Sequence, residues 1–294
     1  MKNKLSLFAV PYVGWMSIFV VAPIIIMVVY AFSTAAGDFT LENFARMGTY
    51  TAVFTRSFKL AIIATLIALL IGYPVSYMLS KEGPQVQRIA MVLIMLPMWM
   101  NFLLRTYSWM SILENNGLLN QLFQQIGLID LYNQIAMHFA SDPAAYVPID
   151  HFQMIGTQGA VVLGMVYNYL PFMILPIYSV LVKLDHSLIE AARDLGCTWM
   201  QAFWKVIIPE IKPGIISGAL IAFTMSIDDF IISYFTAGSG VSTLAMTIYS
   251  MTKKRVSPEI NAISTLLFGA VLLLLIIINV RESRQERLRE RARA

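Results

Sequence analysis

Residues 159–182 read GAVVLGMVYNYLPFMILPIYSVLV, an apolar run of 24 residues that contains no Asp, Glu, Lys, Arg or His. A helix of about 20 apolar residues crosses the ~30 Å hydrocarbon core of a bilayer. The run therefore predicts a membrane-spanning helix, and it sets the fold class for the rest of the chain.

Five further apolar segments of similar length make up much of the 294-residue chain. Charged residues are only 13% of the total, against about 25% in typical soluble domains. We therefore predict an all-α, polytopic membrane protein with six transmembrane helices and a cytoplasmic loop of short helices between the fourth and the fifth. These helices are expected at about residues 8–32, 58–80, 89–113, 159–182, 214–235 and 260–280.

The distribution of Lys and Arg predicts how the chain is oriented, because these residues accumulate in cytoplasmic loops. With the N-terminus inside, the cytoplasmic segments hold 14 of the 21 Lys and Arg residues and the outer segments hold six. The cluster Lys253–Arg255 opposes this orientation, whereas residues 114–158, on the outside, contain no Lys or Arg. We expect both termini in the cytoplasm, with residues 1–280 forming the membrane domain and residues 281–294 a basic tail. The net charge of +4 is then explained by the orientation of the chain in the membrane, and nucleic acid is not an expected partner.

The connection between the fourth and fifth predicted spans reads SLIEAARDLGCTWMQAFWKVIIP over residues 187–209. Ser187 with Glu190, and Thr198 with Gln201, each fit a capping box, in which a side chain at the start of a helix and one three residues later bond reciprocally. Two short capped helices on the cytoplasmic side are therefore expected.

Gly196 fits the left-handed residue that ends the first of these helices, and Pro209 is expected to end or restart the second. The second helix carries three aromatic residues, Trp199, Phe203 and Trp204, and aromatic side chains are enriched in interface hot spots. The segment is therefore interpreted as a docking element for a partner rather than a simple linker. The single cysteine of the chain, Cys197, is expected to be a small packing residue.

The same segment resembles the EAA motif of the permeases of binding-protein-dependent ABC importers, which reads E-A-A, three residues, G, nine residues, I-x-L-P. Glu190–Ala192 and Gly196 match in identity and spacing, and Val206–Pro209 fall on the last element with apolar replacements. The resemblance implies that the segment couples the membrane helices to a dimer of ATP-binding subunits. The residues assigned to this coupling are Ser187, Glu190, Ala191, Ala192, Asp194, Gly196 and Pro209.

The chain contains no G-x-x-x-x-G-K-[ST] phosphate-binding loop. It is therefore expected to bind no cofactor itself and to catalyse no reaction, while ATP and Mg²⁺ bind to the partner ATPase. H-E-x-x-H and G-x-S-x-G motifs are also missing, so an intramembrane enzyme is not favoured.

Further segments resemble the two permeases of spermidine/putrescine importers. Residues 104–109 and 116–120 resemble the first permease. Residues 226–235, 248–251 and 257–262 resemble the second. This resemblance implies uptake of polyamines through the bacterial inner membrane. It also implies an extracytoplasmic polyamine-binding protein and a second permease, which could be a homologue or another copy. Alternatives are an ABC importer permease for another small cationic or organic solute, and a secondary transporter.

Two carboxylates within the fifth predicted span, Asp228 and Asp229, are candidates for the substrate pathway. A charged residue at the centre of a membrane helix costs about 2.5 to 3.5 kcal/mol on insertion scales, so it usually has a function. Successive helical residues point about 100° apart, so at most one of the pair is expected to face a pathway squarely. The alternative is that Arg105, at a similar depth in the third span, neutralises an aspartate as a structural ion pair.

Aromatic residues near the outer halves of the spans provide possible cation–π contacts for a polyamine. An interfacial aromatic belt is the alternative interpretation. The residues assigned to the pathway with the two aspartates are Tyr107, Trp109, Tyr169 and Tyr234.

The outer segment 129–158 contains Asp130, Asp142 and Asp150 and is expected to form an acidic lid or a docking surface for the binding protein. Its two histidines, His138 and His151, lack a metal-ligand spacing, and no metal site is expected.

Overall fold

The computed structural model describes residues 10–34, 37–139, 146–238, 240–254 and 258–293. Over these residues the regular secondary structure is helical, apart from an isolated antiparallel β-bridge between Ser33 and Phe39. The chain divides into two compact units, residues 1–54 with 247–294 and residues 55–246, which are described separately.

The first unit contains the N-terminal and C-terminal helices. Residues Val10–Ala31 form a continuous apolar helix that includes the π-helical turn η1 (Ser17–Val21) and α2 (Ala22–Ala31). It is followed by α3 (Glu42–Ala45) and the 3₁₀ turn η2 (Arg46–Tyr50), and the unit ends with α15 (Pro258–Arg293), which packs against α2 and α3.

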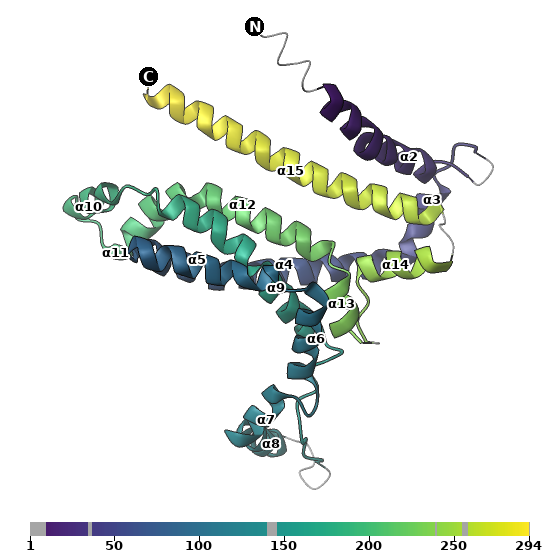
Figure 1. Cartoon of the computed structure of the whole chain (residues 1–294), viewed down its shortest axis with the longest axis horizontal. Coiled ribbons are helices and arrows are strands. Elements are labelled where there is room, and N and C mark those ends of the chain that lie inside the picture. The colour runs from purple at the N-terminus through teal and green to yellow at the C-terminus, as the bar shows by residue number, and fades with distance from the viewer. Residues whose placement is uncertain (1–9, 35–36, 140–145, 239, 255–257, 294) are drawn as a thin grey trace. The chain divides into compact units, whose positions relative to one another are not determined.

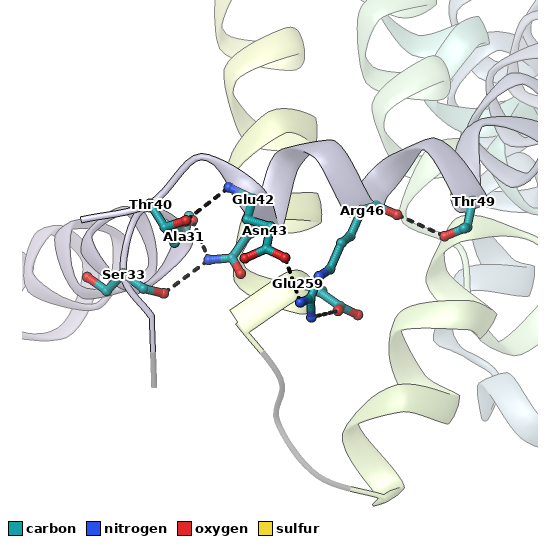
Figure 2. A network of polar contacts seen from close by, with 8 residues as sticks. All are labelled: Ala31, Ser33, Thr40, Glu42, Asn43, Arg46, Thr49 and Glu259. Atoms are coloured by element: carbon teal, nitrogen blue, oxygen red, sulfur yellow. Dashed lines mark hydrogen bonds and ion pairs between the residues drawn. The ribbon is translucent and has the colours of Figure 1, made fainter. Parts of the chain in front are cut away.

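A polar network fixes α3 against its neighbours in this unit (Figure 2). The amide of Asn43 donates to the carbonyl oxygens of Ala31 and Ser33, both at 3.0 Å, so it satisfies carbonyl groups at the end of α2. The guanidinium of Arg46 contacts the carboxylates of Glu42 at 2.8 Å and Glu259 at 3.4 Å, which ties α3 to the start of α15.

The second unit holds the remaining helices (Figure 1). Two of them cross into the first unit, namely α4 (Thr51–Lys81) and α14 (Leu244–Lys254). Between them lie α5 (Pro84–Trp99), α6 (Phe102–Leu113), α7 (Leu118–Gln125), α8 (Leu128–Phe139), α9 (Gln158–Leu181), α10 (His186–Asp194), α11 (Trp199–Ala202), η4 (Phe203–Ile207), α12 (Ile208–Ile227) and α13 (Ile231–Thr236).

The core of this unit lies between α4, α9 and α12. A Cβ atom added to Gly214 would lie 2.7 Å from the carbonyl oxygen of Pro176, so glycine permits the close approach of α12 to α9. The buried hydroxyl of Ser76 donates to the carbonyl oxygen of Ile174 at 3.1 Å and links α4 to α9. The three helices thus form a tightly packed group.

Five helices in the described residues are long and apolar enough to cross a membrane, and a bent pair would make a sixth. The all-α, polytopic fold class is therefore confirmed. The run first quoted is α9, offset by one residue from its predicted bounds.

The third predicted span, residues 89–113, is not one straight helix. Helix α5 ends at Trp99, and the chain bends by 93° before α6 begins at Phe102. The side chain of Asn101 accepts hydrogen bonds from the backbone N–H groups of Leu103 and Leu104 and caps the new helix. The apolar pattern continues across this break, which is why composition alone did not reveal it.

The fifth predicted span, residues 214–235, also differs from the structure. Helix α12 ends at Ile227, and residues 228–230 separate it from α13. At its other end the helix is longer than predicted, because residues Trp199–Ile227 form 29 continuous helical residues through α11, η4 and α12.

Candidate functional site

The start of α10 corrects one of the two predicted capping boxes. Asp185, not Ser187, is the N-cap residue, and its carboxylate accepts a hydrogen bond from the backbone N–H of Ser187 at 2.9 Å. Glu190 is exposed and makes no hydrogen bond or ion pair with the described residues. Aspartate and serine are about equally good N-cap residues, and the helix begins two residues earlier than predicted. Glu190 is therefore available to a partner protein.

The end of α10 explains the spacing between the alanines and the glycine of the EAA segment. Gly196 has φ of 84°, a left-handed conformation that non-glycine residues rarely adopt. The N–H of Gly196 donates to the carbonyl oxygen of Arg193 at 2.9 Å, and the N–H of Cys197 donates to that of Ala192 at 3.0 Å. These two bonds make a complete Schellman motif. Ala192 is also buried, so its side chain anchors the turn that its carbonyl oxygen closes.

The second capping box is confirmed. The side-chain oxygen of Thr198 accepts from the N–H of Gln201, and the side-chain oxygen of Gln201 accepts from the N–H of Thr198 at 2.9 Å. Of the two expectations for Pro209, that it ends the helix or restarts it, the first is wrong: Pro209 stands in the first turn of α12, directly after the π-helical turn η4. A proline lacks the N–H that the carbonyl four residues earlier would accept from, and the wider π turn accommodates this loss.

Aromatic contacts anchor the segment to the end of α4. The rings of Phe203 and Tyr73 have centroids 5.8 Å apart, and those of Trp199 and Tyr77 6.3 Å apart. The ammonium group of Lys81 lies 4.2 Å from the centroid of Tyr77 and 5.6 Å from that of Trp199. These contacts join the segment directly to α4.

One face of the segment is exposed and apolar. Its large exposed side chains are Leu188, Leu195, Trp199, Met200 and Trp204, and Leu195, at the tip of the elbow, is 87% exposed. Beside them is a pocket of about 440 Å³ lined by Glu190, Arg193, Asp194, Gly196, Cys197 and Thr198. Aromatic anchors next to a charged rim are the composition expected of a protein interface.

A second pocket, of about 420 Å³, lies at the opposite end of α12. Its lining residues are Phe102, Tyr169, Thr224, Met225, Asp228, Asp229, Phe230 and Ile231. Asp228 is the C-cap residue of α12, so its carboxylate lies near the negative end of the helix dipole. It is exposed and makes no side-chain hydrogen bond or ion pair with the described residues.

Asp229 has a different environment from its neighbour. It is 6% exposed, and its carboxylate accepts hydrogen bonds from the N–H and the hydroxyl of Ser233 at 2.9 and 3.1 Å. It also accepts from the hydroxyl of Tyr169 at 3.0 Å and from the N–H of Ile232 at 3.4 Å. Asp229 therefore caps α13 and ties it to α9. Both aspartates line the pocket, so the expectation that at most one of them faces a substrate pathway stays a prediction.

Arg105 does not form the proposed structural ion pair with either aspartate in the described chain. It is 8% exposed, and its guanidinium donates to the carbonyl oxygen of Pro97 at 2.7 Å, across the bend between α5 and α6. The guanidinium also lies 5.2 Å from the ring centroid of Phe102 and 5.9 Å from that of Tyr167. Its charge thus stabilises the bend and leaves Asp228 unpaired.

The other aromatic residues assigned to the pathway are only partly brought together. Tyr169 lines the pocket. Tyr107 and Tyr234 both contact the ring of Phe235, with centroid distances of 5.1 and 5.4 Å, and Trp109 packs on Tyr167 at 5.0 Å. These three do not line the pocket, so their assignment stays a prediction.

Two asparagines organise the outer segment. Asn120 donates to the carbonyl oxygen of Phe152 at 3.0 Å and accepts from its N–H at 2.9 Å, and Asn133 does the same with Ile149 at 2.9 and 3.0 Å. Each side-chain amide therefore pairs with both backbone groups of one residue, as a neighbouring β-strand would. The two amides hold the chain around Ile149 and Phe152 against α7 and α8. Asp142 lies outside the described residues, and among those described no group of three metal-ligating side chains occurs.

Phe102, Thr224 and Phe230 were not predicted as pocket residues. They come together only because two predicted spans are broken, at residues 100–101 and 228–230. Asn101, a strong N-cap residue inside an apolar run, is the sequence signal that could have located the first break.

Comparisons with known proteins identify the family to which the chain belongs. The family model described as "Binding-protein-dependent transport system inner membrane component" matches residues 5–287. The spermidine/putrescine transport system permease protein PotB of Haemophilus influenzae is 34% identical over 258 residues, 85% of this chain and 84% of that protein. PotB of Escherichia coli is 35% identical over 238 residues, 78% and 80% of the two chains. The putrescine transport system permease protein PotI of Escherichia coli is 50% identical over 95 residues, 32% and 34% of the two chains.

Among solved structures, a bacterial ABC transporter involved in the import of the acidic polysaccharide alginate gives a TM-score of 0.64 at 18% identity. The match covers 96% of both chains, and at this identity it shows the shared fold. From the family match and the two PotB relatives, the chain belongs to the family of inner membrane components of binding-protein-dependent transport systems.

Proposed function

We propose that this permease subunit imports polyamines such as spermidine or putrescine by alternating access, driven by a separate dimer of ATP-binding subunits. The observation that carries the substrate class is the exposed, unpaired carboxylate of Asp228 in a pocket lined by the rings of Phe102, Tyr169 and Phe230. The names of the PotB and PotI relatives support the same class.

The pocket suits a protonated amine on an aliphatic stem. The carboxylate and the carbonyl end of α12 both favour a positive charge, and aromatic faces attract cations within about 6 Å of their centroids. The hydroxyl of Thr224 donates to the carbonyl oxygen of Leu220 at 2.7 Å, so its oxygen can still accept from an ammonium group. One subunit supplies one unpaired carboxylate to this pocket. A substrate with several amines would need a second anionic group, which a second permease, homologous or identical, would supply.

In this mechanism a movement of the coupling segment would be transmitted along a single helix. Residues Trp199–Ile227 form a continuous helix of about 43 Å at the standard helical rise, whose first turns belong to the coupling segment and whose end is followed by Asp228. Closure of the ATPase dimer, with ATP and Mg²⁺ bound there, would move the elbow at Gly196. The 29-residue helix would then shift the outer pocket, which receives substrate from an extracytoplasmic binding protein.

This mechanism requires the coupling segment to lie in the cytoplasm, with both termini on the same side. The count of Lys and Arg residues supports that orientation. Labelling of single cysteines with a membrane-impermeant maleimide in intact cells would test it, since residue 195 should react only after the membrane is opened.

The substrate proposal is tested by replacing the two aspartates one at a time. Asp228→Asn should abolish most uptake of radiolabelled spermidine while leaving the level of assembled complex unchanged, because its carboxylate has no structural partner. Asp229→Asn should reduce assembly, because the carboxylate holds α13 to α9. Normal uptake by the Asp228→Asn variant in an intact complex would reject the pocket as the polyamine site.

A secondary transporter is the second candidate, because helices broken near a carboxylate also occur in that class. Uptake measured after ATP depletion, with the ion gradient maintained, separates the two. Loss of uptake supports the ATP-driven importer, and retained uptake supports the alternative.

A further inference from the structure

The helices α7 and α8 each carry an exposed apolar stripe for which neither the coupling segment nor the pocket accounts. On α7 the stripe consists of Leu118, Leu122 and the C-cap residue Ile126, and on α8 of Leu131, Ile135 and Phe139. Both sets are spaced by four residues, so each covers an arc of about 80° on its helix. Phe139 is 82% exposed and Leu118 68% exposed.

A neighbouring arc of each helix, centred about 100° from the stripe, is polar but carries no Lys or Arg. Gln121, Gln124 and Gln125 lie on α7, and Asp130, Gln134 and His138 on α8, and all are exposed. A third face of each helix is occupied by the asparagine that binds the extended chain. Each helix is therefore amphipathic at its surface, and its third side already makes hydrogen bonds within the protein.

The bend between α5 and α6 sets the direction of this hairpin. Helices α4, α5 and α12 run in one general direction, and α6 crosses that direction steeply and carries α7 and α8 away from the bundle (Figure 1). The bend itself is 93°. If the long apolar helices follow the membrane normal, α6 leaves their outer end nearly parallel to the membrane plane.

We propose that the α7–α8 hairpin lies in the outer interface of the lipid bilayer, with its two apolar stripes inserted between lipid headgroups. Amphipathic helices that lie in the plane of a membrane bury one apolar face at the boundary of headgroups and acyl chains. A soluble binding protein is a poorer occupant, because it leaves after each cycle and would return six large apolar side chains to water. The polar arc, with Asp130, would then face away from the membrane, toward the protein that delivers substrate.

The absence of Lys and Arg from residues 106–158 adds a specific feature to this proposal. Interfacial helices often depend on attraction between basic residues and anionic lipids. Here insertion depends on apolar contact alone, so it should not change with the anionic lipid content or with salt.

Site-directed spin labelling tests the proposal on the full chain, purified with its associated subunits. Cysteines would be placed singly at Leu122 and Ile135 on the stripes and, as matched controls, at Gln121 and Gln134 on the polar arcs, in a Cys197→Ser background. The labelled protein would be reconstituted in vesicles of phosphatidylethanolamine, with or without phosphatidylglycerol. Collision with oxygen, which concentrates in lipid, and with a water-soluble nickel chelate would then be measured for each label.

The ratio of oxygen to nickel collisions should be severalfold higher for the stripe labels than for the controls, and equal in both vesicle compositions. Similar ratios at all four positions would overturn the proposal. So would stripe labels that neither reagent reaches, since that result would place a companion protein over them. Stripe labels that lose nickel collisions only when a binding protein is added would identify that protein as the occupant and would also reject insertion in lipid.

Discussion

The two ends of the helix Trp199–Ile227 differ in how their structure is specified. The coupling end is built from contacts between residues close in sequence: a cap at Asp185, a Schellman turn at Gly196 and a capping box at Thr198. The pocket end is built from residues far apart, since Tyr169 binds an aspartate 60 positions away and Phe102 lies on another helix. Local motifs can be read from a sequence, whereas such distant contacts depend on where helices break. Changes made between the two ends, or at one of them, test this contrast.

The largest effect is expected from Gly214→Ala, which disturbs the connection between the two ends. The new Cβ would lie 2.7 Å from a backbone oxygen of α9, so α12 must shift or tilt. Overpacking of this kind costs about 1 to 3 kcal/mol. We expect a lower thermal midpoint of the purified complex and impaired uptake. The matched control is Gly269→Ala, where no atom lies within 4 Å of the new Cβ, and an equal loss there would contradict the packing explanation.

A smaller effect, confined to the coupling end, is expected from Gly196→Ala. There is open space around this residue, so the cost comes from its left-handed backbone and amounts to about 1 to 2 kcal/mol. ATP-driven uptake should fall while binding of spermidine to the pocket, measured by equilibrium dialysis, stays unchanged. Gly196→Asn, which tolerates this conformation better, should retain more uptake than the alanine variant. Equal loss in both variants would show that the left-handed turn is not the cause.

Loss of the helix cap should have a still smaller effect. Replacing Asp185 by alanine removes the side chain that accepts from the N–H of Ser187, at a cost of about 1 kcal/mol. Amide hydrogen exchange in the first turn of α10 should become faster. Ser187→Ala should leave exchange unchanged, because that hydroxyl is not the cap. Faster exchange in the Ser187→Ala variant would instead show that Ser187 caps the helix, as the sequence predicted, and would contradict the structure.

The smallest effect on stability is expected at Glu190, whose carboxylate makes no hydrogen bond or ion pair with the described residues. Glu190→Gln and Glu190→Ala should both leave the thermal midpoint unchanged. If the charge is recognised by the ATPase, both should reduce ATP-driven uptake to a similar extent. Uptake that is preserved in the glutamine variant alone would show that hydrogen bonding, rather than charge, is what the partner recognises.

The fold class was predicted well from the sequence because long runs without charged residues are typical of helices that cross a lipid bilayer. The sequence also predicted the turn at Gly196 and the box at Thr198, because both depend on residues within four positions of each other. It failed at Ser187, where two possible capping residues two positions apart compete, and it did not predict the π turn that comes before Pro209. It could not distinguish Asp228 from Asp229, because the partners of Asp229 include Tyr169, on a helix placed only by tertiary packing.

The continuity of the helix from Trp199 to Ile227 has a consequence for insertions and deletions. One residue added within α12 would rotate everything after it by about 100° and advance it along the axis. Asp228 would then turn away from the rings of its pocket, while the elbow at Gly196 and its contacts with α4 stayed in place. A change of length in the middle of this helix would therefore act as a change of phase between the segment proposed to dock the ATPase and the pocket proposed to bind the substrate.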